Sequence, residues 1–282
     1  MGLNKICIIT GATAGIGLET AKQLSVMDFD IYIIGRNEVK CQQTITLLKV
    51  INPQNKYGYF LADFEKLKDI RIVAEKINQQ LPKIDVLVNN AGTVFEKREL
   101  TEDGYEKTFA VNHLAPFLLT NLLLPTIRKS GDSRIVNVAS DSHYPGKINF
   151  EDLHYNKGYF VLRAYERSKL ANVLFSNHLA KLLKNENITV NSLNPGRVKS
   201  DIGHQNTGFL FSSIWKVFDI LTGIPTPEGA KTSVYLASSS DVQNITGKYF
   251  NKCKEKQASK LALDEQVAQK LWDVSATLVG LD

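Results

Sequence analysis

The segment Thr10-Gly11-Ala12-Thr13-Ala14-Gly15-Ile16-Gly17 decides the fold, because it joins the apolar run Ile6–Ile9 directly to a stretch with helical spacing, Leu18–Val26. Glycines at such a junction allow a tight turn, and they let the backbone approach a pyrophosphate that then sits on the helix N-terminus. Its position at the first strand-to-helix junction predicts a dinucleotide-binding turn, with Thr13 among its cofactor-binding residues.

The rest of the chain repeats this alternation of short apolar runs and helical stretches, such as Glu38–Val50 and Glu65–Gln80. Apolar runs without polar alternation imply strands covered on both faces, and therefore a parallel sheet with helices on each side. We predict a doubly wound (Rossmann) α/β fold of about seven strands, with residues 1–282 forming a single domain. The strand candidates are Ile6–Ile9, Ile31–Ile34, Tyr57–Leu61, Val86–Val88, Ile135–Val138, Thr189–Leu193 and Lys248–Phe250.

Composition places the chain among soluble globular proteins, because 43% of its 282 residues are hydrophobic and 22% are charged. The three cysteines, Cys7, Cys41 and Cys253, share no metal-ligand spacing, so we expect no metal site, no disulfide framework and a reducing compartment. The apolar run Leu114–Pro125 is well below the roughly 20 residues that span a bilayer, and it is interpreted as a buried helix. No signal peptide precedes the first apolar run, so the expected location is cytoplasmic.

The net charge of +5, from 34 basic and 29 acidic side chains, is too small to indicate a nucleic-acid partner. The densest basic stretch, Lys248–Lys260, is interpreted as a solvated loop. We therefore expect individual basic residues, and not the net charge, to bind anionic groups.

Arg36 follows the second predicted strand, 19 positions past Gly17. An acidic residue there would bind the ribose 2′-hydroxyl of NAD, whereas a basic residue accommodates the 2′-phosphate of NADP. The planar guanidinium of Arg36 suits a phosphate, so we predict NADP(H) as the cofactor rather than NAD(H). The alternative is that Arg36 merely begins the next helix.

Polar and small residues also follow the third and fourth predicted strands. Asp63 is placed to accept a hydrogen bond from the adenine amino group, and Asn89, Ala91 and Gly92 stand where the fourth strand meets the same edge of the sheet. Each could be ordinary turn chemistry, since turns favour Asp, Asn and Gly. Their recurrence at successive strand ends is what indicates a cofactor site.

Tyr165 and Lys169 are four residues apart on a helical stretch, which places them on one face, one turn from each other. A tyrosine that acts as an acid or base near neutrality needs its pKa to fall by about 3 units, or roughly 4 kcal/mol. A cation about 4 Å away at an effective dielectric near 20 supplies about that much. We therefore expect Lys169 to lower the pKa of Tyr165.

Two further polar residues complete the candidate catalytic set. Ser140, 25 residues before Tyr165, follows a predicted strand, where its hydroxyl could hold a substrate oxygen beside the phenol. Asn112 falls in an apolar helix, where a buried amide must find partners, and organising a water near Lys169 is one way to do so. Ser140 could equally be a turn residue.

Residues 201–225 interrupt the alternation of strand and helix and carry a heavy aromatic load between Phe209 and Phe218. In a doubly wound fold such an insertion lies at the carboxyl edge of the sheet, where ligands bind. We interpret the segment as a substrate lid. A packing helix and a surface that touches membranes peripherally are the alternatives.

Taken together, TGATAGIG, the NNAG after the fourth strand, Asn112, Ser140, YERSK and Asn194-Pro195-Gly196 resemble the short-chain dehydrogenase/reductase family. Within the family, the likeness is closest to the retinol-dehydrogenase-like branch, on the segments Val111-Asn112-His113-Leu114, YERSKLANVLF, TGKYFNKCK and KLWDVSATLVGL. The resemblance covers nearly the whole chain. It implies hydride transfer between a nicotinamide and a small-molecule alcohol or carbonyl substrate of apolar character, such as a retinoid, steroid or lipid-derived aldehyde or ketone. It also implies association into a homodimer through the helix that carries Tyr165.

The resemblance assigns a role to each matching residue. Tyr165 would be the general acid/base, Lys169 would lower its pKa and bind the nicotinamide ribose, Ser140 would orient the substrate oxygen, and Asn112 would support a proton relay. A non-catalytic NADP(H)-binding sensor or scaffold and a sugar-nucleotide epimerase remain alternative functions. The positions that match the family's cofactor-binding segments are Gly11, Gly15, Ile16 and Gly17 at the pyrophosphate, and Pro195, Gly196, Val198 and Ser200 at the nicotinamide.

Overall fold

A single eight-stranded sheet forms the centre of the computed structural model, which describes residues 4–198 and 223–281. The strand order is β3-β2-β1-β4-β5-β6-β7-β8, and every neighbouring pair is parallel except β7 with β8. This order confirms the predicted doubly wound sheet. The strands are β1 (Lys5–Thr10), β2 (Phe29–Gly35), β3 (Tyr57–Leu61), β4 (Val86–Asn89), β5 (Ser133–Val138), β6 (Ile188–Asn194), β7 (Tyr249–Asn251) and β8 (Lys254–Glu255).

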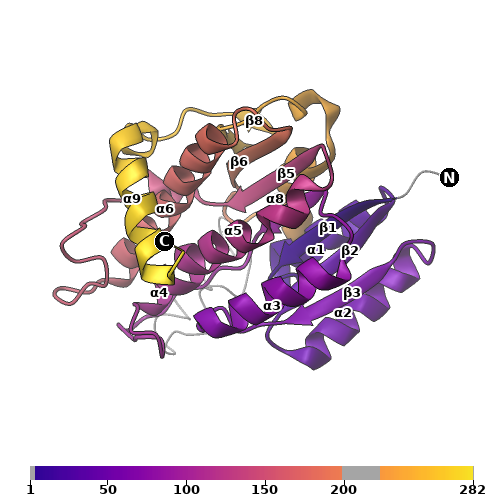
Figure 1. The fold of residues 1–282 in the computed structure, drawn as a ribbon, viewed down its shortest axis with the longest axis horizontal. Helices are drawn as coiled ribbons and strands as arrows, with labels where there is room; N and C mark the ends of the chain where they lie inside the picture. The colour runs from indigo at the N-terminus through magenta and orange to yellow at the C-terminus, as the bar shows by residue number, and fades with distance from the viewer. Residues whose placement is uncertain (1–3, 199–222, 282) are drawn as a thin grey trace.

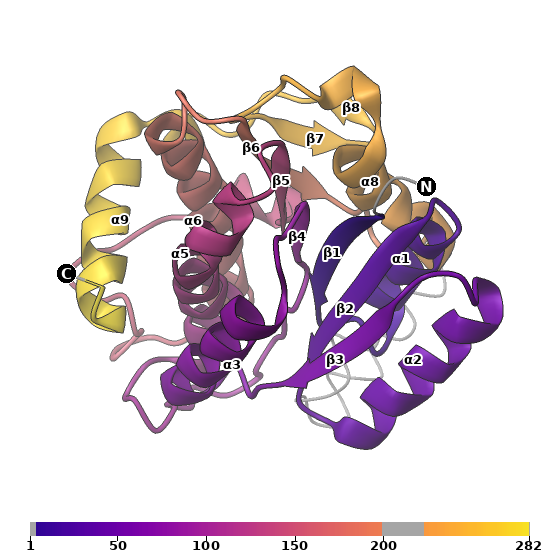
Figure 2. The ribbon, with the colours of Figure 1, turned by 45° about the vertical axis from the view of Figure 1, so that its right-hand side comes forward.

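Helices cover both faces of the sheet (Figures 1 and 2). One hydrophobic core joins α3, α5, α6 and α9 to one face, and a second joins α1, α2 and α8 to the other. The helices are α1 (Gly15–Ser25), α2 (Glu38–Ile51), α3 (Leu67–Gln80), α4 (Lys107–Phe109), α5 (Ala115–Arg128), α6 (Val161–Leu182), α8 (Thr226–Ser238) and α9 (Glu265–Val279). Shorter turns are the π-helical η1 (Ala110–Leu114) and the 3₁₀ turns η2 (Asp141–His143), η4 (Ser240–Val242) and η5 (Leu261–Leu263).

The central strands are apolar on both sides because both sides are covered. Every residue of β5 is buried, and so is every residue of β1 after Lys5. The strand order reverses between β1 and β4, which pair in parallel, so the connections that leave their carboxyl ends run in opposite directions along the sheet. That point is where open α/β sheets bind ligands.

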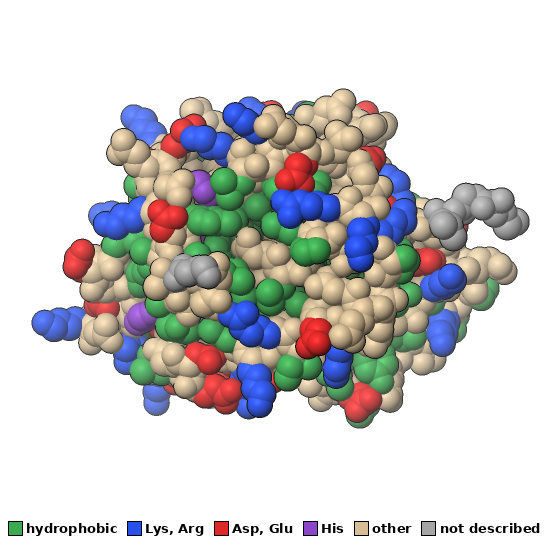
Figure 3. Space-filling model, in the orientation of Figure 1, with side chains coloured by type: hydrophobic (Ala, Val, Ile, Leu, Met, Phe, Trp, Pro, Cys, Tyr) green, Lys and Arg blue, Asp and Glu red, His purple; other side chains and the backbone are tan. Residues whose placement is uncertain are grey.

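The eighth strand, β8, was not expected, because its two residues are exposed and give no apolar signal. The predicted strand Lys248–Phe250 is confirmed as β7, in which Tyr249 and Phe250 are buried, so the interpretation of Lys248–Lys260 as a solvated loop is wrong for these residues. On the face shown in Figure 3, Lys and Arg side chains are mixed with Asp and Glu and form no continuous basic patch.

The apolar run around α5 is a core helix. Among residues 4–198 and 223–281, only Lys107–Arg128 is long and apolar enough to cross a membrane, and 72% of its most apolar window is buried inside the protein. This burial confirms the interpretation of the run as a buried helix.

The C-terminal helix α9 packs along α6 (Figure 1). Its Trp272 contacts Phe117 of α5 and Phe175 of α6, with ring centroids 4.8 and 5.9 Å apart. Asp264 caps the start of α9, and Gly280 ends it with a left-handed φ of 64°. A homodimer formed through α6 would therefore have to use the part of that helix that α9 leaves uncovered.

A buried ion pair joins α6 to the short helix α4. The Arg167 Nη2 atom lies 2.7 Å from Glu106 Oε2, and the two side chains are only 1% and 0% exposed. Glu106 also accepts hydrogen bonds from the backbone N–H groups of Thr108 and Phe109, at 2.7 and 2.9 Å. The guanidinium lies 4.3 Å from the centre of the Tyr155 ring, so the two opposite charges are paired within the protein, although Arg167 Nε has no hydrogen-bond partner among the described residues.

Replacing Arg167 with Leu is expected to lower the free energy of unfolding by about 3–5 kcal/mol, because Glu106 would keep a buried charge without its partner. Urea denaturation of both proteins measures this loss. The matched control is Arg128→Leu, which removes an exposed pair with Glu186 and should cost less than about 1 kcal/mol. Equal losses in the two variants would contradict the role of the buried pair.

Candidate active site

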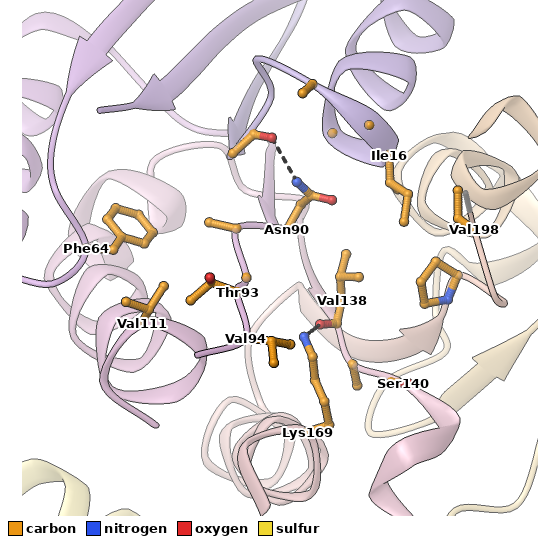
Figure 4. Close-up of a pocket in the computed structure, with 18 of the residues that line it drawn as sticks. Ile16, Phe64, Asn90, Thr93, Val94, Val111, Val138, Ser140, Lys169 and Val198 are labelled. Atoms are coloured by element: carbon orange, nitrogen blue, oxygen red, sulfur yellow. Dashed lines mark hydrogen bonds between the residues drawn. The ribbon is translucent and has the colours of Figure 1, made fainter. Parts of the chain in front are cut away.

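A cleft of about 830 Å³ opens at the carboxyl ends of the central strands, where the strand order reverses. Figure 4 shows Ile16 and Val198 on one side of it, Phe64 and Val111 on another, and Ser140 beside Lys169. Most residues predicted from the sequence to form a site meet here. Those that line the cleft are Gly11, Thr13, Gly15, Ile16, Gly17, Arg36, Asp63, Ala91, Gly92, Ser140, Tyr165, Lys169, Pro195, Gly196 and Val198.

Close backbone packing explains the glycines of the turn between β1 and α1. A Cβ atom on Gly17 would lie 2.4 Å from Asn90 Nδ2 and 2.5 Å from the Gly11 carbonyl oxygen. Gly11 itself has a φ of +67°, and a Cβ atom there would lie 2.9 Å from Ala91 Cα. The turn is thus compact, with its backbone along the cleft at the N-terminus of α1, which fits the pyrophosphate of a dinucleotide.

Asn90, rather than Asn89, joins this turn to the end of β4. Its Nδ2 donates to the carbonyl oxygens of Thr10 and Gly11 at 2.8 and 3.2 Å (Figure 4). The Asn89 side chain points away from the cleft and donates to Asn137 Oδ1 and Thr120 Oγ1 at 2.8 and 2.9 Å. The prediction that Asn89 lines the cofactor site therefore does not match its placement, because successive residues at a strand end face opposite sides.

The end of the cleft near β2 and β3 carries one basic and two acidic residues. The Arg36 side chain is 58% exposed, and its Nη1 lies 3.6 Å from Glu65 Oε1. Asp63 Oδ1 accepts a hydrogen bond from the Glu65 backbone N–H at 3.1 Å, which fixes the turn after β3. Arg36 is thus held at the rim with its guanidinium open to solvent, an arrangement that fits an anionic group such as a phosphate.

Lys169 is buried beneath the middle of the cleft. Its Nζ donates to the Val138 carbonyl oxygen at 3.0 Å, as Figure 4 shows, and lies 5.5 Å from the centre of the Tyr165 ring. Burial lowers the pKa of Lys169 to about 8, because desolvation disfavours the charged ammonium.

The pKa of Tyr165 differs from the sequence-based expectation. Burial raises it to about 12, whereas the hydrogen bond with the Ser140 side chain acts in the opposite direction. The predicted lowering by Lys169 does not appear in the protein on its own, where desolvation of the phenol is the largest influence on its pKa. Tyr165 is consequently a protonated phenol at neutral pH.

Ser140 stands between the end of β5 and the turn η2. Its Oγ accepts a hydrogen bond from the Ser142 backbone N–H at 3.1 Å and donates to Ser142 Oγ at 3.2 Å. Ser140 thus caps η2 while its hydroxyl faces the cleft beside Tyr165. Ser142, which also lines the cleft, was not identified from the sequence, since a second serine in a turn is unremarkable.

Asn112 is buried in the π-helical turn η1 and does not line the cleft. Its Oδ1 accepts from the Thr93 backbone N–H at 2.8 Å, and its Nδ2 donates to the Thr93 carbonyl and to Ser168 Oγ at 2.9 and 3.0 Å. The amide holds the segment after β4 in place. Asn112 and Lys169 both approach Gly92, because a Cβ atom there would lie 3.5 Å from Asn112 Oδ1 and 3.5 Å from Lys169 Nζ. The proton relay through Asn112 stays a prediction.

Apolar side chains also line the cleft. Val94 and Phe95 follow β4, and Leu162 comes from the first turn of α6. These residues carry no sequence motif, and only the fold reveals them. Ser200 and residues 201–222 of the predicted lid, including its aromatic part from 209 to 218, lie outside the described residues, whereas Val198 and Ile224 pair as a parallel bridge.

Comparison with known protein families gives a direct match. A family model for short chain dehydrogenases matches residues 5–208. The chain is 38% identical to retinol dehydrogenase 14 of Mus musculus over 288 residues, which cover 98% of this chain and 86% of the relative. It is 39% identical to retinol dehydrogenase 13 of Homo sapiens over 284 residues, which cover 99% and 85%.

Solved structures share the same architecture. An uncharacterized protein from Mycobacterium Paratuberculosis superposes with a TM-score of 0.78 at 28% identity, covering 98% of this chain and 93% of that one. RhlG of Pseudomonas aeruginosa, solved as an NADP active-site complex, superposes with a TM-score of 0.69 at 24% identity, covering 94% and 96%. The second likeness shows the fold alone.

Replacing Lys169 with Met is expected to stabilise the protein. Its pKa falls from 10.5 to about 8 on folding, so the charged form costs about 3 kcal/mol at pH 7. Loss of the hydrogen bond to Val138 offsets about 1 kcal/mol of the gain. Urea denaturation at pH 7 should therefore show the variant about 2 kcal/mol more stable.

The pH dependence of this gain has a definite sign. Both states carry a charged Lys169 below about pH 8, and only the unfolded state does so between about 8 and 10.5. The advantage of Lys169→Met should consequently shrink as pH rises through that window. The control Lys181→Met, at an exposed side chain, should show neither effect. A variant less stable than wild type at pH 7 would refute the argument.

Proposed function

This chain belongs to the short-chain dehydrogenase/reductase family, and we propose that it is an NADP(H)-dependent oxidoreductase that transfers a hydride between nicotinamide and an alcohol or carbonyl compound. The observation that carries the proposal is the gathering of Tyr165, Ser140 and Lys169 at one end of a cleft whose other end holds Arg36. A bound nicotinamide cofactor would supply or accept the hydride.

Side chains of the protein would then bind the substrate oxygen and transfer a proton to it. Ser140 donates a hydrogen bond to that oxygen, and the Tyr165 phenol delivers its proton to it. The Tyr165 phenol is protonated at neutral pH, so it can act as the proton donor when a carbonyl is reduced to an alcohol. Lys169 is still mostly charged at pH 7, so it stabilises the phenolate that remains after proton transfer.

The preference for NADP(H) over NAD(H) rests on Arg36. Its exposed guanidinium stands after β2 at the rim of the cleft, where the 2′-phosphate of the adenosine ribose would lie. Asp63 and the turn from Gly11 to Gly17 would hold the remainder of the adenosine and the pyrophosphate. Ala91, Gly92, Pro195, Gly196 and Val198 would surround the nicotinamide half.

An apolar substrate is supported by the side chains of Val94 and Leu162 in the cleft, Leu162 lying about one helical turn before Tyr165 in α6. The names of the relatives, retinol dehydrogenases 13 and 14, point the same way, towards retinoid, steroid or lipid-derived aldehydes and ketones. A cytoplasmic location, with peripheral contact to membranes where such substrates dissolve, forms part of the proposal.

Purified protein with NADPH is therefore expected to reduce members of a panel of apolar aldehydes and ketones. Tyr165→Phe should lower kcat by about 10²–10⁴-fold, because the proton donor is lost, while the Kd for NADPH changes little. Tyr57→Phe is the matched control, since that hydroxyl bonds to Ser25 and Asn52 at the edge of the sheet and should leave kcat unchanged.

The same assay separates the two functional classes. NADPH binding without reduction of any carbonyl in the panel would favour a non-catalytic sensor or scaffold. Full activity in Tyr165→Phe would exclude the proposed acid.

Arg36→Leu tests the choice of cofactor. Removing a charge-assisted contact to phosphate should weaken NADPH binding by about 10- to 100-fold, equivalent to roughly 1.5–3 kcal/mol. The Kd for NADH should stay the same, because NADH lacks the 2′-phosphate. Fluorescence titration of both cofactors measures this, and a wild-type preference for NADH would overturn the assignment of Arg36.

A further inference from the structure

We propose that His143 is a positioning residue for Ser140: its imidazole ties the loop that carries Ser140 to the C-terminal segment Tyr249–Ser259. The proposal rests on the oxidoreductase function inferred above, because it concerns how the hydroxyl of Ser140 is held. His143 is fully buried at the end of η2, and it does not line the cleft. It therefore acts through Ser140 and not on the substrate.

The hydrogen bonds of His143 fix its tautomer. The backbone N–H of Ser259 donates to Nε2 at 3.1 Å, and a backbone N–H can act only as a donor. Nε2 thus carries no proton, so Nδ1 carries it and donates to the Ser140 carbonyl oxygen at 2.8 Å. The neutral ring bridges two backbone groups that are 119 positions apart in sequence, at Ser140 and Ser259.

Aromatic packing holds the ring in this orientation. Its centroid lies 4.1 Å from that of Tyr144 and 4.6 Å from that of Tyr249, with the latter ring nearly perpendicular at 62°. Tyr249 is itself buried in β7. Because rings on two sides confine the imidazole, its nitrogens cannot leave Ser140 and Ser259 without repacking.

The other side chains of the loop attach to the same C-terminal segment. Asp141 Oδ1 accepts from Tyr249 Oη at 2.9 Å and from Lys256 Nζ at 3.0 Å. Tyr144 Oη donates to the Gln257 carbonyl oxygen at 2.6 Å. These bonds fasten η2 as a unit, whereas among the described residues only the His143 ring connects the C-terminal segment back to the backbone of Ser140.

The Ser140 carbonyl receives two donors from one residue. The backbone N–H of His143 donates to it at 3.0 Å, in addition to the ring Nδ1. Without the ring, the backbone bond alone would hold the start of η2. The hydroxyl of Ser140 would then vary in position relative to Tyr165, and misplacement by about 1 Å can cost about 10²-fold in rate.

The first experiment compares His143→Phe with wild type. Phenylalanine keeps the packing between Tyr144 and Tyr249 but removes both nitrogens. We expect kcat to fall about 10- to 100-fold, with the Kd for NADPH unchanged. His143→Asn, whose amide retains an N–H close to the position of Nδ1, should recover part of the loss.

His178→Phe is the matched control. His178 is another buried histidine of the described chain, packed on Trp272 with ring centroids 5.0 Å apart and outside the cleft. A general loss of stability from replacing a buried histidine would appear in both variants. Only His143→Phe should lower kcat.

A double-mutant cycle separates positioning from a purely structural role. In a Ser140→Ala background, His143→Phe should change kcat by less than about twofold, because the hydroxyl that His143 positions is already absent. The same fold loss in both backgrounds would overturn the proposal, as would full activity of His143→Phe. Nitrogen NMR of the imidazole should show a protonated Nδ1, and a protonated Nε2 would equally overturn it.

These outcomes are distinct from failure of the proposed function. A wild-type protein that binds NADPH but reduces no carbonyl would overturn the proposed function together with the catalytic part of this inference. An active wild type whose kcat is insensitive to His143→Phe would overturn this inference alone.

Discussion

The buried ammonium of Lys169 is the constraint around which the site is arranged. It donates to the Val138 carbonyl at the end of β5, and the side chain is only 3% exposed. Taking a cation out of water is unfavourable unless the surroundings are rigid and polar. The parallel sheet supplies that rigidity, because the ends of β4 and β5 lie side by side in it. Their pairing fixes the position of the Val138 carbonyl, which accepts the hydrogen bond from the ammonium.

Helix α6 carries two buried cations, Arg167 and Lys169, and only Arg167 forms an ion pair among the described residues. Arg167 is neutralised by Glu106 and covered by aromatic rings, so its charge serves the fold. Lys169, two residues later, forms no ion pair with a carboxylate of the described residues, and burial lowers its pKa to about 8. The paired charge of Arg167 holds two helices together, whereas the unpaired charge of Lys169 suits the proposed role of stabilising a phenolate in the cleft.

The sequence alone was sufficient to predict those site residues that follow a recognisable spacing. The glycine turn follows from its place after the first strand, and the pairing of Tyr165 with Lys169 follows from the period of a helix. Asn89 shows the limit of this reasoning. Asn89 and Asn90 are neighbours at a strand end and face opposite sides, so a prediction that is wrong by one residue selects a side chain in the core instead of one in the cleft. His143 could not be recognised, because its partner Ser259 lies far away in sequence and only folding brings them together.

The chemistry-bearing motifs described here end before residue 200, yet the last third of the chain holds them in place. Helix α9 packs along α6 on the side away from the sheet, so the helix that carries Tyr165 and Lys169 is enclosed by the chain itself. The segment from Tyr249 to Ser259 bonds to the loop that carries Ser140. The two halves of the proposed catalytic set, one on a helix and one on a strand end, therefore have their relative position fixed by α9 and by Tyr249–Ser259, neither of which lines the cleft.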